Sequence, residues 1–197
     1  MSMTTRKSIA STFLPDDRVL RIATFLVLAL AGSLVLAVSA KAKVPFYPVP
    51  MTLQTLAVMA IVAAYGLRLG TATIALYLVE GALGLPVFTG TPEKGIGLVY
   101  MMGPTGGYLA GYIVAALIVG LAVERGWSGK PFRLFGAMFL ADAAVFALGI
   151  AWLGALMGWD KPILDWGLYP FVLGDLVKVA LAASGIAALD ALIARWR

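Results

Sequence analysis

Six long apolar runs, separated by short polar or Gly- and Pro-containing segments, set the pattern of this chain. Each run approaches the roughly 20 apolar residues that a helix needs to cross a bilayer. The runs cover residues 21–40, 51–67, 69–88, 104–123, 134–157 and 169–192. No long polar stretch interrupts the series. The pattern predicts an all-α integral membrane protein with six transmembrane helices, a segment at 1–20 and one transmembrane domain at 21–197.

The first run has an alternative interpretation as a cleaved signal sequence. Basic residues precede it, and residues 38–40, Val-Ser-Ala, loosely resemble a signal-peptidase site. However, the run is longer than the usual apolar region of about 7–15 residues, and five more runs follow it. We therefore expect a retained helix in a multi-pass protein of the plasma (inner) membrane.

The composition supports a membrane protein and excludes several chemistries. Hydrophobic residues make up 61% of the chain and charged residues 13%, with a mean hydropathy of +0.95, whereas soluble domains average about 45–50% and 25%. Cys and His are both absent, so thiolate chemistry and His-based metal sites or proton relays are excluded. The net charge of +5 lies mostly between apolar runs and does not indicate nucleic-acid binding.

The basic residues predict the orientation. Ten Lys and Arg residues lie at the two chain ends, near 66–68 and in 124–133, whereas four lie in the opposite loops. Cytoplasmic loops carry the excess of positive charge. We therefore expect both termini in the cytoplasm and outer loops at 41–50, 89–103 and 158–168.

Asp175 and Lys178 lie inside the sixth apolar run. At a spacing of three they share one helix face, and each costs about 2.5–3.5 kcal/mol at a bilayer centre on insertion scales. They must therefore face the protein interior or a watery cavity. Two alternatives follow: an ion pair that locks two helices together, or a site for a polar solute.

Helical depth places other polar residues beside this pair. At 1.5 Å per residue, Asp175 lies ~9 Å, Lys178 ~13 Å and Glu80 ~12 Å from the outer ends of their runs. Gln54 is also near the outer side. The Pro-rich outer loop at 44–50 is expected to be stiff and extended, and the backbone of the Gly-rich loop at 89–103 can pass close to a ligand. We expect a polar cavity that opens outward.

Four sequence blocks resemble those of a known family. They are VPMTLQTL at 49–56, GALGLPVF at 81–88, GPTGGY at 103–108 and GDLVK at 174–178. Their order is similar to that of BioY, the biotin-specific S component of energy-coupling-factor transporters. The resemblance implies a six-helix protein for high-affinity biotin capture and uptake, which works with a transmembrane T component and two cytoplasmic ATPases. Residues 89–94 (TGTPEK) depart from the family's usual small, Gly-rich loop.

Biotin suits the chemistry of the expected cavity. Asp175 or Glu80 can accept bonds from the ureido N–H groups, and Lys178 or Gln54 can donate to the ureido carbonyl. Tyr77, Phe88 and Tyr108 are candidates for an apolar wall. Lys43, with Lys41 and Lys94 as substitutes, is the candidate partner of the valerate carboxylate. Four further aromatic residues fit an outer interfacial belt: Trp159, Trp166, Tyr169 and Phe171.

Two further features of the runs lead to separate expectations. Ala29, Ser33 and Ala37 form a small-residue stripe on the first helix, which fits either internal packing or a docking face for the T component. The resemblance favours docking, because a small-residue face of the first helix docks that component in the family. Asp142 lies in the inner half, so we exclude it from the solute site and expect an ion pair or a water-exposed position.

Two other functional classes remain as alternatives. An intramembrane aspartyl protease would need Asp142 and Asp175 in hydrogen-bonding contact, but their depths separate them by ~9 Å along the membrane normal. A stand-alone carrier of another small solute is the second. Residues 126–131 (GWSGKP) lack the P-loop spacing, so if transport is driven by ATP, the ATPase is a partner. We expect no enzyme activity, cofactor or metal.

Overall fold

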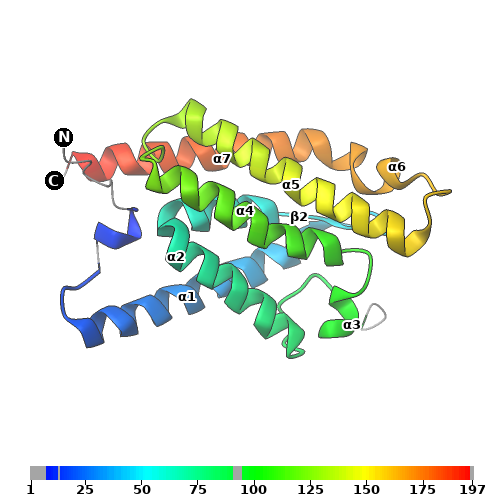
Figure 1. The fold of residues 1–197 in the computed structure, drawn as a ribbon, viewed down its shortest axis with the longest axis horizontal. Helices are drawn as coiled ribbons and strands as arrows, with labels where there is room; N and C mark the ends of the chain where they lie inside the picture. The colour runs from blue at the N-terminus through cyan, green and yellow to red at the C-terminus, as the bar shows by residue number, and fades with distance from the viewer. Residues whose placement is uncertain (1–7, 13, 91–94, 196–197) are drawn as a thin grey trace.

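The computed structural model describes residues 8–12, 14–90 and 95–195. Its elements are η1 (Ala10–Thr12), α1 (Arg18–Lys41), β1 (Lys43–Val44), β2 (Met51–Thr52), α2 (Gln54–Ala82), α3 (Leu98–Met101), α4 (Gly106–Glu124), α5 (Pro131–Met157), α6 (Ile163–Gly167) and α7 (Tyr169–Ala194). The long helices lie along the long axis of the molecule (Figure 1). The fold is all-helical apart from the two-residue strands β1 and β2.

Five helices of the described chain are long and apolar enough to cross a membrane: α1, α2, α4, α5 and a stretch that joins α6 to α7. The protein is therefore a multi-pass membrane protein by its helix lengths and composition. The prediction of six spanning helices differs from this number because the second and third apolar runs belong to one element, α2.

α2 is a helical hairpin, which reverses at Gly66. This residue has φ 81° and ψ −179°, in the region of positive φ that favours glycine. The reversal brings Gln54 Nε2 within 2.6 Å of Tyr77 Oη, although these residues would lie about 34 Å apart on a straight helix. Each arm of the hairpin is shorter than the roughly 20 residues of a typical span.

Small residues allow the helices to approach closely. A Cβ added at Gly111 of α4 would lie 2.7 Å from Val145 Cα of α5, and one at Gly120 would lie 2.7 Å from Leu67 Cα of α2. In lipid, where no hydrophobic effect drives helices together, such close packing is a main source of association. α4 thus packs between α2 and α5.

The two ends of the molecule are formed by different structural elements. η1, the start of α1 and the end of α7 lie at one end (Figure 1), where the Gly66 turn also packs on Ser8. The other end holds α3, α6 and the antiparallel β1–β2 pair, in which Lys43 faces Thr52 and Val44 faces Met51. Trp159 and Tyr169 are exposed there, as the interfacial belt predicts, whereas Trp166 is partly buried against the core.

Candidate functional site

A cavity lies at the end of the molecule that holds β1 and β2. The centre of a water molecule can move through only about 50 Å³ of it, so its side chains enclose a narrow space. Its walls come from the segment 49–55, Phe88 and Thr89, Tyr100, Thr105, and inward faces of α4, α5 and α7. The eight predicted substrate-binding residues can be compared with this lining. Gln54, Phe88, Tyr108, Asp175 and Lys178 belong to it, but Tyr77 does not.

The Asp175–Lys178 pair is buried and connects α7 to the start of α2. Lys178 Nζ donates to Asp175 Oδ1 at 2.5 Å and to the carbonyl oxygen of Thr52 at 2.7 Å. Thr55 Oγ1 also donates to Asp175 Oδ1, at 3.0 Å. Mutual neutralisation and these bonds offset the cost of two buried charges. The pair therefore joins two helices and lines the cavity at the same time, so the two alternatives for it are compatible.

Gln54 anchors a second polar network at the cavity wall. Its Nε2 donates to Tyr77 Oη at 2.6 Å, and its Oε1 accepts bonds from Thr52 Oγ1 at 3.2 Å and Thr89 Oγ1 at 3.3 Å. Tyr77 Oη in turn donates to the carbonyl of Val87 at 3.2 Å. Tyr77 was predicted as a wall residue, but it lies fully buried behind Gln54. It therefore positions Gln54 and the 87–89 segment.

Aromatic rings form the apolar part of the cavity. Phe88 stacks on Tyr100 with ring centroids 5.2 Å apart. Tyr108 presents its ring to the cavity while its hydroxyl donates to the carbonyl of Gly167 at 2.8 Å. Phe171 packs against Phe146 at 6.2 Å and is only 5% exposed. The assignment of Phe171 to the interfacial belt was therefore wrong, because its side chain points inward to the cavity.

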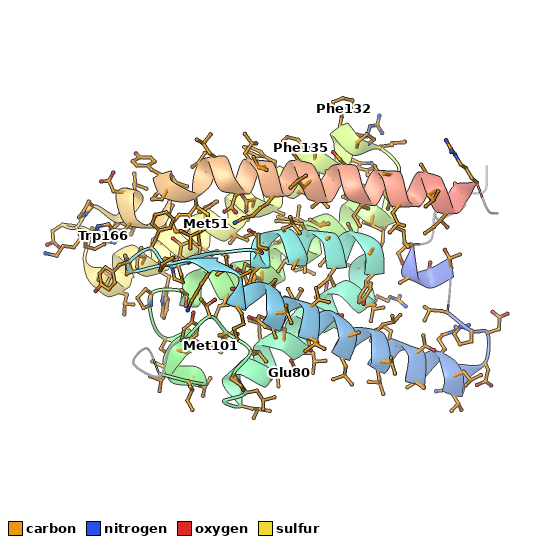
Figure 2. All side chains as sticks on the ribbon, turned by 180° about the vertical axis from the view of Figure 1, so that it is seen from behind. Met51, Glu80, Met101, Phe132, Phe135 and Trp166 are labelled. Carbon is orange, nitrogen blue, oxygen red and sulfur yellow. The ribbon has the colours of Figure 1, made fainter. Side chains whose placement is uncertain are left out.

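Glu80 and Lys43 lie outside the cavity lining. Glu80 accepts a bond from Ser33 of α1 at 3.1 Å. Figure 2 shows Glu80 well away from Met51, which does line the cavity. Tyr77 takes the position facing Gln54, so Glu80, almost one helical turn further along, meets α1 instead. Lys43 is exposed, and its ammonium donates to the carbonyl of Thr89 at 3.1 Å. Lys94 lies outside the described residues.

The small-residue stripe of α1 faces inward. Ala29 and Ser33 are buried, Ser33 with 3% exposure, and Ala37 packs against the core. A Cβ at the neighbouring Gly32 would lie 2.6 Å from Thr73 Cγ2 of α2. The stripe is therefore an internal contact between α1 and α2, and its prediction as a partner-docking face was wrong. The outward face of α1 instead carries large side chains such as Leu30 and Leu34.

Several cavity residues were missed in the sequence. Thr52 and Thr55, which hold the charged pair, lie within the 49–56 block, and their polarity beside Gln54 was an available signal. Tyr112 also lines the cavity. It follows Tyr108 by four residues, so the two share a helix face. Tyr100 had no periodic signal, because it lies on the short helix α3.

The environment of Asp142 matches neither the ion pair nor the water-exposed position that we expected. Its side chain is buried, and Oδ1 has no hydrogen-bond partner among the described residues. It lies on the face of α5 that continues to Val145 and Phe146, which line the cavity. It has no ion-pair partner within residues 8–12, 14–90 and 95–195, and its side chain is not exposed. It also makes no hydrogen bond to Asp175 in the described chain, as a protease dyad would require.

Comparison with known proteins identifies the family. The model of the BioY family matches residues 6–195. The chain belongs to the BioY family. The biotin transporter BioY of Thermotoga maritima is 37% identical over 146 residues, which cover 74% of this chain and 83% of that protein. The biotin transporter BioY of Rhodobacter capsulatus is 36% identical over 167 residues, which cover 78% of this chain and 86% of that protein.

A solved structure supports the fold of this BioY-family chain. It is the crystal structure at 2.1 Å of the S-component for biotin from an ECF-type ABC transporter, with a TM-score of 0.73 over 86% of this chain and 92% of that one. The two sequences are 22% identical, so this likeness concerns the fold alone. The names of the related proteins describe transporters, which weighs against an intramembrane protease.

Proposed function

We propose that this protein captures biotin and takes it up across the plasma membrane as the S component of an energy-coupling-factor transporter. One observation carries the proposal: in a BioY-family chain, a buried Asp–Lys pair lines a narrow cavity with aromatic walls. The cavity combines a few placed polar groups with apolar rings, which is the usual character of a small-molecule site.

The polar groups of the cavity match the ureido ring of biotin. Within the described chain, the bonds from Lys178 and Thr55 to Asp175 both use Oδ1, which leaves Oδ2 to accept a ureido N–H. The Lys178 ammonium has three N–H donors. Two of them serve Asp175 and the Thr52 carbonyl, and the third makes a long bond of 3.5 Å to Thr55 Oγ1, so the ureido oxygen can replace Thr55 as its acceptor. Gln54 borders the same space.

The rings and the rim of the cavity suit the rest of the ligand. Phe88, Tyr108 and Phe171 can surround the thioether ring. A bicyclic ligand exceeds the narrow space, so its entry requires displacement of side chains at the cavity mouth. There the ammonium of Lys43 donates a hydrogen bond to the carbonyl of Thr89, and Thr89 is itself part of the cavity lining. We place the valerate carboxylate beside Lys43 at this rim.

The proposed topology has six membrane segments with both termini in the cytoplasm. In this arrangement the two arms of α2 cross separately, and residues 1–20 form a cytoplasmic segment. The excess of basic residues at the η1 end supports it. The Gly66 turn, the start of α1 and the end of α7 share that end. The cavity end then faces outward, where biotin arrives.

Energy for uptake must come from other subunits. Residues 126–131 lack a P-loop, so we propose partnership with a transmembrane T component and two cytoplasmic ATPases. Because the Ala29–Ser33–Ala37 stripe is internal, contact with the T component has to use other surfaces. The outward face of α1, with Leu30 and Leu34 exposed, is the candidate.

Equilibrium binding of biotin to the purified protein tests the proposal. We expect saturable binding of one biotin per chain, with desthiobiotin and biotin amide as comparisons for ring and tail contacts. Absence of saturable binding would contradict biotin capture. Biotin accumulation in liposomes that contain this chain alone, without ATP, would instead favour the stand-alone carrier.

A further inference from the structure

Asp142 is a buried carboxyl group that the proposed binding site does not use. Its side chain is 6% exposed, and Oδ1 has no hydrogen-bond partner in the part of the chain that the structure describes. α5 packs against α4, α6 and α7, and none of these helices supplies an ion-pair partner to Asp142 among the described residues. An unpaired buried carboxylate is strongly disfavoured, most of all at membrane depth.

The position of Asp142 relates it to the cavity. Val145 and Phe146 follow it by three and four residues and line the cavity, so Asp142 lies one turn below them on the same helix face. Three titratable groups on the helices packed against α5 line the cavity above it: Tyr112 of α4, and Asp175 and Lys178 of α7. Asp165 of α6 is exposed, and α6 lies at the end of the molecule that holds α3.

The charges of this cluster do not balance if every carboxyl group is ionised. Asp142 and Asp175 would then share the single positive charge of Lys178. Lys178 already binds Asp175 and the Thr52 carbonyl. A proton on Asp142 would make the cluster neutral without any movement. A metal ion is a poor substitute, because the described residues contain no group of three or more His, Cys, Asp or Glu side chains that could hold one.

We propose that Asp142 is a protonated carboxyl group beneath the cavity floor, and that its proton is required for the cavity to hold its ligand. The requirement of this proton for ligand binding rests on the proposed function. When Asp142 ionises, its negative charge competes with Asp175 and the ligand for Lys178. The affinity for biotin is then full while Asp142 is protonated and falls as rising pH removes that proton.

Infrared spectroscopy of the purified protein during a pH titration tests the proton directly. We expect a carbonyl stretching band of a protonated carboxyl group that persists at neutral pH, where exposed carboxyl groups are ionised. The band should be absent from Asp142→Asn and retained in the matched control Asp165→Asn. A wild-type spectrum without such a band at neutral pH would overturn the proposal, and so would a band that Asp142→Asn retains.

A binding titration tests the coupling to the ligand. Biotin amide is the probe, because it has no carboxylate that titrates. Between about pH 5 and about pH 9, we expect wild-type affinity to fall by at most about tenfold per pH unit above the pH at which the infrared band disappears. Asp142→Asn should bind without that dependence. An equal pH dependence in both proteins would overturn the coupling. The infrared titration does not require biotin to be the ligand, so failure of the proposed function is distinguishable from failure of this inference.

Discussion

The junction of α2 with α7 and the junction of α1 with α2 each contain an acidic side chain within the membrane, but they use it differently. At the first, Asp175 binds Lys178 and Thr55 and borders a cavity. At the second, Glu80 accepts a bond from Ser33 of α1, where Gly32 allows close contact with Thr73. The α2–α7 junction has polar groups that line a cavity, whereas the α1–α2 junction is a packing contact. The sequence predicts a similar depth for both carboxylates, so the helix face decides the role.

The largest expected effect is at Lys178. Lys178→Met leaves Asp175 as a buried charge without its partner, and breaking a buried pair in this way costs about 3–5 kcal/mol of stability. Thermal unfolding of the purified protein in detergent measures this loss. Glu80→Gln is the matched control at the other junction, since it keeps an acceptor for Ser33 and should change stability little. Equal losses in the two variants would remove the distinction between the junctions.

The next effect concerns the α1–α2 contact. Ser33→Trp places a large ring in a closely packed interface, and overpacking of this kind costs about 1–3 kcal/mol. Leu34→Trp, on the exposed face with 64% exposure, should leave the stability of the isolated protein unchanged but reduce copurification with the T component. If Ser33→Trp unfolds at the wild-type temperature, the stripe is not an internal contact.

A smaller effect is expected at the apolar wall. Phe171→Ala removes a ring that borders the cavity and packs on Phe146, and we expect biotin affinity to fall about tenfold, or about 1.4 kcal/mol. Tyr169→Ala, two residues away and exposed, should bind normally. Calorimetric titration of biotin compares them. Equal affinities for the two variants would mean that Phe171 packs beside the cavity without contributing to ligand binding.

The smallest effect is at the rim. Lys43→Met should weaken biotin binding about threefold, because an exposed ion pair contributes at most about 1 kcal/mol, and should leave biotin amide almost unaffected. Competition of the two ligands against labelled biotin gives both values. If both ligands weaken equally, Lys43 acts by holding the Thr89 carbonyl rather than by pairing with the tail.

The sequence predicted the parts of this molecule that depend on apolar length and local pattern. The helical segments follow from the apolar runs, and Asp175, Lys178, Gln54, Phe88 and Tyr108 line one cavity as expected. It did not predict the parts that depend on which face each helix presents. Glu80 and the Ala29–Ser33–Ala37 stripe were misplaced because depth along a helix carries no information on its rotation about the axis. A nearly uniform apolar surface gives little signal for that rotation.

The role of Phe171 and Asp142 illustrates the same limit. From the sequence alone, an aromatic residue near a helix end fits an interfacial belt and a cavity wall equally well. Only the packing against Phe146 and Phe46 decides between them. Likewise, the inner-half position of Asp142 suggested separation from the site, but α5 carries it directly beneath two cavity residues.

The central claim is that the α2–α7 junction binds the ureido ring through Asp175 and Lys178. Equilibrium binding of biotin to the Asp175→Asn/Lys178→Met double variant tests this most directly. The variant removes both charges together, so no lone charge remains and the fold should persist. A hydrogen bond to a charged group contributes about 1.5–3 kcal/mol, so the account predicts a loss of affinity of at least about tenfold to 150-fold in a folded, monodisperse protein. Wild-type affinity in that protein would contradict it and leave the pair as a purely structural link between the helices.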